Sequence, residues 1–228
     1  MSPRMSRPIK DPVSGFSPYY GCVIIAAAAA IFFGIIAWSA YTLFRQDAEI
    51  DQFTVASATL PPRIELSAED SKALSTKTQT LQQAINSAKP GTLTLTIAEL
   101  NTLVAQAPDL GNGSYADIVR FTGTNPEKKL LLADIALPLN PLPFSGKPKR
   151  YLVGKASFQV EVTSEGPDAR IIAIDVPGKS IPSGFIESQQ AWTWITPYHQ
   201  DPALSATLKA LRSARVTPEG LTLSTQPE

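Results

Sequence analysis

The feature that most constrains the fold is an uncharged apolar run, Cys22–Phe44, which reads CVIIAAAAAIFFGIIAWSAYTLF. As a helix its 23 residues would be about 34 Å long, enough to cross a hydrocarbon core of about 30 Å. Apolar residues occur on all sides of this helix, without the polar stripe that the half-buried core helix of a soluble protein shows. We therefore predict one transmembrane helix over residues 21–44.

The charges beside this run predict its orientation. Arg4, Arg7 and Lys10 precede it, and acidic residues follow it closely. The positive-inside rule then predicts a cytoplasmic tail, residues 1–20, and an extracytoplasmic C-terminal part, as in a single-pass protein of the bacterial inner membrane. A cleaved signal peptide would have a shorter apolar region, of about 7–15 residues. We expect an uncleaved anchor, although Ala37-Trp38-Ser39 has the small-x-small pattern of a cleavage site.

The composition of the remaining chain excludes some classes of function. The residues after the run carry 17 basic and 19 acidic side chains, a net charge of −2, which argues against nucleic acid as a partner. A single cysteine, Cys22, excludes any intrachain disulfide. We predict a linker over 45–66, ending at Pro61-Pro62, and one extracytoplasmic domain over 67–228.

Local signals divide this domain into helices and strands. Ser67, followed by Glu69 and Asp70, predicts a helix start, and a short strand follows at Thr92–Leu95. Thr96 and Glu99 have the spacing of a capping box, which predicts a helix to about Ala105. Asp109–Ser114 is predicted to be a turn-rich loop.

The second half of the chain predicts an antiparallel meander of four strands: Asp117–Phe121, Leu130–Leu137, Leu152–Val162 and Ala169–Val176. The third strand alternates strictly, with Leu152, Ala156, Phe158 and Val160 on one face, typical of a half-buried strand. We then expect helices over Ser183–Trp194 and after Asp201-Pro202, and a hairpin of Ala214–Thr217 with Leu221–Thr225. Strands and helices do not alternate regularly. The predicted fold class is therefore α+β, an antiparallel sheet packed on helices.

The sequence contains no recognisable catalytic or metal-binding motif. HExxH, CxxC, P-loop and GxGxxG patterns are absent. The only histidine, His199, stands between two predicted helices, and the only cysteine lies in the apolar run. We predict no enzymatic activity, no catalytic residue, no cofactor and no metal site.

A Leu/Pro segment near the middle of the domain suggests contact with a membrane or an apolar ligand. Leu137–Phe144 contains three prolines, which predict an extended loop. Its apolar side chains and the cations after it suit a lipid surface with phosphates; the candidate contact residues are Leu139, Leu142, Phe144, Lys147, Lys149 and Arg150. The alternative is a Pro-rich crossover whose leucines cap the core.

Aromatic residues supply three further candidates for ligand or membrane contact: Phe158, Trp192 and Trp194. Two tryptophans that are two residues apart on the predicted helix would face different directions. One of them is then free to line a groove or rest on a bilayer interface. The alternative is that both pack against the sheet and the next helix.

Several short motifs occur in an order that resembles a known group of proteins. They are LTLTIAELNTLVAQ with Asn101, KRYLVGKASFQVEV with Arg150 and Tyr151, and IDVPGKSIPSGFI with Gly178 and Pro182. Together they are similar to uncharacterised membrane-anchored bacterial envelope proteins, some of which resemble half of a tubular lipid-binding (TULIP-like) module. The resemblance covers about residues 92–225 and implies a curved sheet on a long helix, with no catalytic residue to carry over.

These expectations combine into one functional hypothesis and one alternative. The hypothesis is a membrane-anchored, non-enzymatic envelope protein that binds lipid or another apolar ligand between its sheet and helices. The alternative is a structural envelope protein that acts through contacts with other envelope proteins and has no ligand. The expected partners are therefore the lipid bilayer, an apolar ligand and other envelope proteins.

Overall fold

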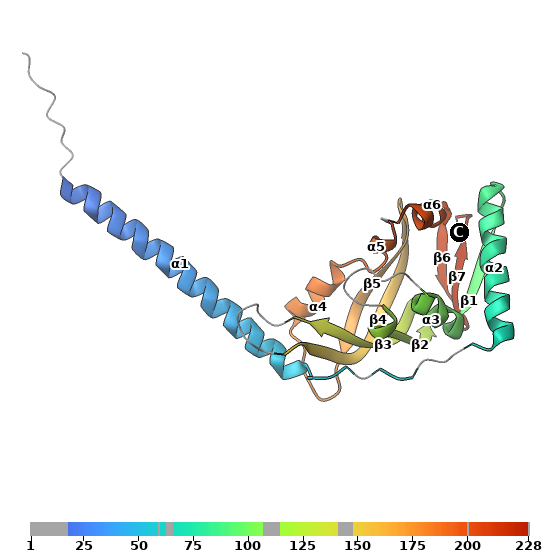
Figure 1. Ribbon diagram of the computed structural model, residues 1–228, viewed down its shortest axis with the longest axis horizontal. Coiled ribbons are helices and arrows are strands. Elements are labelled where there is room, and N and C mark those ends of the chain that lie inside the picture. Colours follow the sequence, from blue (N-terminus) through green and yellow to red (C-terminus); the bar gives the residue numbers. More distant parts are fainter. Residues whose placement is uncertain are drawn as a thin grey trace, which may run out of the picture. The chain divides into compact units, whose positions relative to one another are not determined.

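The computed structural model describes residues 18–58, 60–62, 66–106, 115–140, 148–199 and 201–227. The chain divides into two units, Met1–Glu49 and Ile50–Glu228. The first unit contains most of α1 (Pro18–Phe53), a helix long and apolar enough to cross a membrane (Figure 1). The predicted cytoplasmic tail lies almost wholly outside the described residues.

Helix α1 continues beyond Phe44 to Phe53. The sequence had predicted that a linker starts at residue 45. The segment after Phe44 contains no glycine or proline that would stop the helix. Arg45 and Glu49 also form an i,i+4 ion pair on it, with 3.1 Å between Nε and Oε1. The predicted linker 45–66 is therefore helical in its first part.

The second unit begins before residue 67, the boundary predicted from the sequence. Phe53 is only 1% exposed, and its ring packs edge-on against Phe185 at 5.2 Å between centroids. Val55 forms an antiparallel bridge with Tyr151, and each backbone N–H donates to the other's carbonyl at 2.8 Å. Residues 53–55 thus belong to the folded part of this unit.

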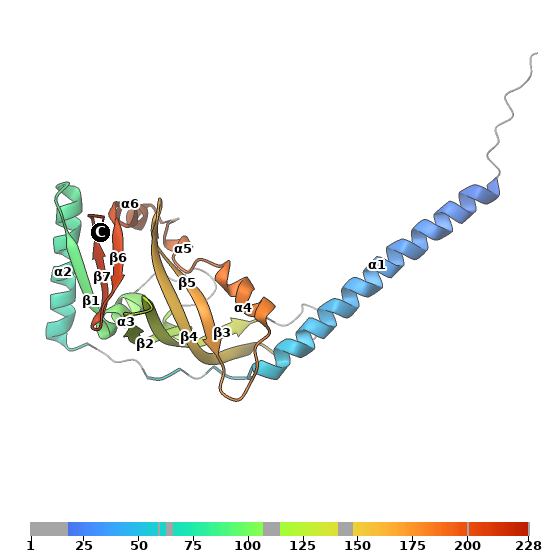
Figure 2. The ribbon, with the colours of Figure 1, turned by 180° about the vertical axis from the view of Figure 1, so that it is seen from behind.

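The second unit contains two antiparallel sheets in its described part, which confirms the predicted α+β class. The four-stranded sheet is a meander of β2 (Val119–Asn125), β3 (Leu130–Leu139), β4 (Arg150–Thr163) and β5 (Gly166–Asp175), as the sequence predicted. Figure 2 shows the long strands β4 and β5 curving across the unit. The three-stranded sheet has the order β1-β7-β6, formed by β1 (Thr92–Thr96), β7 (Gly220–Ser224) and β6 (Ser213–Val216).

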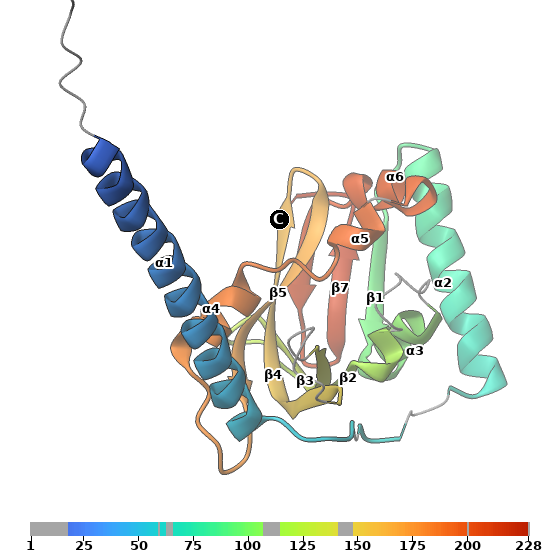
Figure 3. The same cartoon turned by 60° about the vertical axis from the view of Figure 1, so that its left-hand side comes forward.

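The helices pack around these sheets. The predicted cap of α2 (Ala68–Asn86) is confirmed, because Ser67 Oγ accepts a hydrogen bond from the Asp70 N–H. A short 3₁₀ helix, η1, spans Tyr115–Asp117. Helix α3 contacts strands of both sheets, and α6 contacts β5 and α2 (Figure 3). The remaining helices are α3 (Ile97–Gln106), α4 (Ser183–Gln190), α5 (Thr196–His199) and α6 (Pro202–Ala210).

Two predicted boundaries are wrong in ways that affect the site. Helix α4 ends at Gln190, so Trp192 and Trp194 lie in the connection to α5 and not on a helix. Strand β3 includes Pro138 and Leu139, which the sequence placed in a loop. The pairing of β3 with β2 ends at Ile135. Pro138 lies beyond that point, so its missing N–H removes no hydrogen bond between β3 and β2. The predicted loop Asp109–Ser114 lies outside the described residues.

The predicted capping box holds β1 and α3 together. The Thr96 N–H donates to Glu99 Oε2 at 2.8 Å, and the Glu99 N–H donates to Thr96 Oγ1 at 3.2 Å. Lys77 Nζ on α2 donates to Glu99 Oε1 at 2.7 Å. Burial alone would raise the pKa of the Glu99 carboxyl, but the hydrogen bonds and charge of Lys77, together with Thr96, hold that pKa below its ordinary value of 4.5.

Because the pKa of Glu99 is lowered by folding, its contribution to stability is present above about pH 4.5 and is lost as the pH falls below it. We predict that Glu99→Gln loses about 1–2 kcal/mol of unfolding free energy at neutral pH. Its unfolding free energy should also fall less steeply than that of the wild type on acidification. Urea unfolding at several pH values measures both quantities. Equal acid slopes for the two proteins would contradict this role.

A buried asparagine joins α3 to the four-stranded sheet. Asn101 is 5% exposed, and its Nδ2 donates to the Phe121 carbonyl while its Oδ1 accepts from the Phe121 N–H, both at 2.8 Å. The side-chain amide therefore bonds the backbone of β2 as a neighbouring strand would. The pairing of β2 with β3 shifts register between Phe121 and Gly123, so this amide supports an irregular part of the strand.

We predict that Asn101→Ala costs about 2–4 kcal/mol of unfolding free energy, because it leaves two backbone groups of the half-buried Phe121 without partners. Chemical denaturation measures the loss. Asn86→Ala, at an exposed position on α2, is the control and should change stability by about 0.5 kcal/mol or less. Similar losses in the two variants would show that the Asn101 bridge is unimportant.

Candidate ligand cavity

An apolar cavity of about 510 Å³ lies between the two sheets and helices α3, α5 and α6. Every strand except β6 contributes to its wall. The described residues that line it are Leu95, Leu100, Leu103, Val104, Gln106, Tyr115, Val119, Phe121, Leu131, Phe158, Val160, Pro167, Ala169, Trp194, Ile195, Tyr198, Leu204, Leu208, Leu221 and Leu223.

Simple periodicities place these side chains in the wall. Phe158 and Val160 are two residues apart on β4, so both face the same side of the sheet. Leu100, Leu103 and Val104 have the i, i+3, i+4 spacing that forms one face of α3. The wall is therefore built from regular elements.

An aromatic cluster forms the part of the wall next to α5. The Trp194 ring packs edge-on against Phe158 at 5.3 Å and lies 5.4 Å from Tyr115. The Trp194 backbone N–H donates to the Ala169 carbonyl at 3.0 Å, which fixes the α4–α5 connection to β5. The Tyr115 hydroxyl donates to the Trp194 carbonyl at 2.9 Å. These contacts hold the rings in fixed positions beside the cavity.

None of the described lining residues carries an ionisable group apart from the phenols of Tyr115 and Tyr198. Burial raises the pKa of the Tyr115 phenol. Burial, with the neighbouring Tyr115, raises the pKa of Tyr198 to about 12. Both hydroxyls therefore stay protonated and neutral at physiological pH, and this wall carries no charge.

The edges of the cavity include both open and closed parts. Gln106, at the end of α3, and Leu204, on α6, are exposed, so one rim reaches the surface. Elsewhere the β4–β5 turn packs tightly on α6. Gly166 has a positive φ of 112°, and a Cβ there would overlap the Leu208 carbonyl oxygen. Only glycine suits this approach.

Two of the residues predicted as contacts line the cavity, Phe158 and Trp194. Leu139 is half-buried and packs against the main core, while Lys149 is exposed with its Nζ 5.7 Å from the centroid of the Tyr151 ring. Trp192 is 58% exposed and is not part of the described wall. The other predicted residues Leu142, Phe144 and Lys147 lie outside the described residues.

Arg150 occupies a position that the prediction of a lipid contact did not foresee. Its side chain is buried and forms an ion pair with Asp51. Its backbone lies opposite Leu139 in the β3–β4 ladder. A buried guanidinium paired with a carboxylate serves the fold and is not presented to lipid phosphates. Arg150 is therefore not part of the exposed cationic group that the sequence predicted beside the Leu/Pro segment.

Sequence reasoning missed most of the cavity wall. The spacing of Leu100, Leu103 and Val104 was available as a signal on the predicted helix. Leu221 and Leu223 belonged to a predicted hairpin, but nothing in the sequence indicated that β1 would pair with β7. That pairing, with Leu95 opposite Leu221, brings them to the wall.

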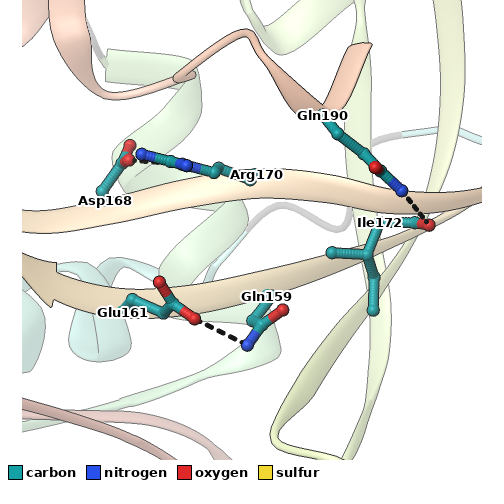
Figure 4. Close-up of a pocket in the computed structure, with 6 residues that line it drawn as sticks. All are labelled: Gln159, Glu161, Asp168, Arg170, Ile172 and Gln190. Carbon is teal, nitrogen blue, oxygen red and sulfur yellow. Dashed lines mark hydrogen bonds and ion pairs between the residues drawn. The ribbon is translucent and has the colours of Figure 1, made fainter. Parts of the chain in front are cut away.

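A second, polar pocket of about 230 Å³ lies at β4 and β5, lined by Gln159, Glu161, Asp168, Arg170, Ile172 and Gln190 (Figure 4). Its polar groups bond one another. Gln159 Nε2 donates to Glu161 Oε1 at 2.7 Å, and Arg170 Nε donates to Asp168 Oδ2 at 3.0 Å. Gln190 Nε2 donates to the Ile172 carbonyl at 3.1 Å. We regard the larger apolar cavity as the candidate site, because the polar groups of this pocket already have partners.

Metal ligands do not gather in the described part of the chain, where no three His, Cys, Asp or Glu side chains are placed to share an ion. Comparison with known proteins gives no match: no protein-family model, no curated protein and no solved structure aligns significantly with this chain.

Proposed function

We propose that this protein is a membrane-anchored binding protein that holds an acyl chain, or a ligand of similar apolar character, in the cavity between its two sheets. The observation that carries the proposal is the cavity itself: about 510 Å³, with a described wall made almost entirely of apolar side chains. Ligand sites of about 300–1,000 Å³ with few polar groups are typical of small-molecule binding.

The volume suits a long chain. A cavity of about 150 Å³ accommodates benzene, so a cavity of about 510 Å³ has room for roughly 20 carbon atoms by proportion. Transfer of such a chain from water is favourable by about 25 cal/mol for each Å² of apolar surface that becomes buried. Rings held in place on the wall, such as Trp194 and Phe158, reduce the ordering cost of binding.

Helix α1 supports placement of this domain at a membrane. The helix is long and apolar enough to span a bilayer, and basic residues precede it while acidic residues follow it. We propose an uncleaved anchor with the N-terminus in the cytoplasm and the binding domain outside it, in a bacterial envelope. A chain tethered to a bilayer would have acyl lipids at hand as ligands.

We propose binding without catalysis, because the described wall offers no nucleophile with an adjacent base. His199, the one histidine of the chain, is not among the described lining residues. General acid–base chemistry needs a titratable group near the operating pH. The phenols on the wall, with raised pKa values, do not supply one.

Filling the cavity should prevent ligand binding. Ala169 lines the cavity, whereas Ala173, on the same strand, is exposed and lies outside the described wall. We predict that the full-length wild-type chain, transferred from lipid nanodiscs into native mass spectrometry, retains a stoichiometric acyl-lipid adduct. Ala169→Phe should reduce the adduct severalfold, because the ring occupies the space of the chain, and Ala173→Phe should leave it unchanged. Absence of an adduct from the wild type, or equal loss in both variants, would refute the proposal.

The proposed topology has a separate test. We predict that a cysteine placed at Gln226, an exposed position near the end of the domain, reacts with a membrane-impermeant maleimide in intact cells when Cys22 is replaced by serine. A cysteine placed at Ser2 should react only after permeabilisation. The reverse labelling pattern would overturn the orientation.

A further inference from the structure

Resting on the proposed function, we infer that the cavity selects acyl chains that carry an uncharged hydrogen-bond acceptor, an ester, over free fatty-acid anions, and that the Tyr198 hydroxyl donates to this acceptor. The inference deepens the proposal from an apolar ligand to a chemical class. It follows from the charges and the hydrogen-bond donors of the described wall.

The charge balance disfavours an anion. The described wall has no lysine, arginine or histidine. On α6, which borders the cavity, Lys209 pairs with Glu165 at 2.8 Å between Nζ and Oε2. On α3, Glu99 pairs with Lys77 at 2.7 Å. A carboxylate in the cavity would therefore be desolvated without a cation, or would compete with a protein carboxylate for one.

The hydrogen-bond donors favour a neutral acceptor. The Tyr115 hydroxyl is already used, since it donates to the Trp194 carbonyl. The hydroxyl of Tyr198, whose ring lies 5.7 Å from that of Tyr115, has no hydrogen bond to the described part of the chain. The buried indole N–H of Trp194 also has no acceptor there. The Tyr198 hydroxyl is thus a donor without an acceptor, which an ester carbonyl can satisfy without bringing a charge into an apolar site.

The raised pKa of Tyr198, about 12, is consistent with this role. The phenol keeps its proton throughout the physiological range and remains a donor. A neutral donor on an apolar wall bonds an ester carbonyl and leaves the hydrocarbon chain to the leucines of α3 and β7. The ester group of such a ligand therefore matches Tyr198, and its hydrocarbon chain matches the leucines that line the same cavity.

Trp194 provides a reporter inside the wall. The full-length chain has three tryptophans, and replacing Trp38 and Trp192 by phenylalanine leaves Trp194 as the sole indole. This chain, in nanodiscs of unbrominated lipid, is titrated with three matched probes: dibrominated stearic acid at a pH where it is ionised, its methyl ester, and the corresponding dibrominated hydrocarbon. Bromine quenches indole fluorescence on contact. A chain that keeps Trp192 in place of Trp194 controls for quenching outside the cavity.

We expect all three probes to quench Trp194, with the ester binding about three- to tenfold more tightly than the hydrocarbon and at least tenfold more tightly than the ionised acid. Tyr198→Phe should remove most of the advantage of the ester over the hydrocarbon and leave hydrocarbon binding unchanged. Tyr115→Phe, which removes a hydroxyl that already donates within the protein, is the matched control and should preserve the ester preference.

The outcomes separate this inference from the proposed function. No quenching of Trp194 by any probe, in a chain whose circular dichroism is that of the wild type, would overturn the proposed function and this inference with it. Equal affinity for ester and hydrocarbon, or tightest binding of the acid, would overturn the inference alone. Equal loss of all three probes in Tyr198→Phe would show that Tyr198 only shapes the wall, and would also overturn its role as a donor.

Discussion

The antiparallel pairing of β1 with β7 determines where the other elements of the second unit can pack. The two strands align from Thr92 opposite Ser224 to Thr96 opposite Gly220. The Thr94 and Thr222 hydroxyls bond each other at 3.2 Å across this ladder, between residues 128 positions apart in the sequence. This pairing forms the second sheet, brings α3 between the two sheets, and supplies one wall of the cavity. The four-stranded meander alone has no such enclosure.

Local parts of the fold could be predicted because their signals lie within a few residues. The Thr96–Glu99 capping box, the alternation along β4 and the C-terminal hairpin were all predicted, since each depends on neighbouring positions. The β1–β7 pairing was not predicted, because nothing in strand sequences such as TLTLT and GLTLS specifies which distant strand they pair with. The end of α4 was also missed, because Trp194 bonds the Ala169 carbonyl in place of continuing a helix.

The same division applies to the site. Phe158 and Trp194 were predicted as contacts, the first from strand alternation and the second from its aromatic character, and both line the cavity. Arg150 was placed at a lipid surface, because an arginine after Lys147 and Lys149 looks like part of an exposed cationic group. Its partner Asp51 lies 99 residues earlier, and an ion pair over that separation, which buries the arginine side chain, has no local sequence signal. The position of the Tyr198 hydroxyl beside the cavity depends on the three-dimensional arrangement alone.

The β1–β7 pairing also determines when the cavity can form during synthesis of the chain. Synthesis runs from β1 to β7, so the nascent chain contains β1, α3 and the whole meander before the strand that encloses the cavity exists. Closing so long a loop is an entropically slow step, which local hairpins do not share. Until then the wall of the cavity lacks the β7 residues Leu221 and Leu223. Under the proposed function, a ligand would therefore be enclosed between the sheets only after β7 has been translated.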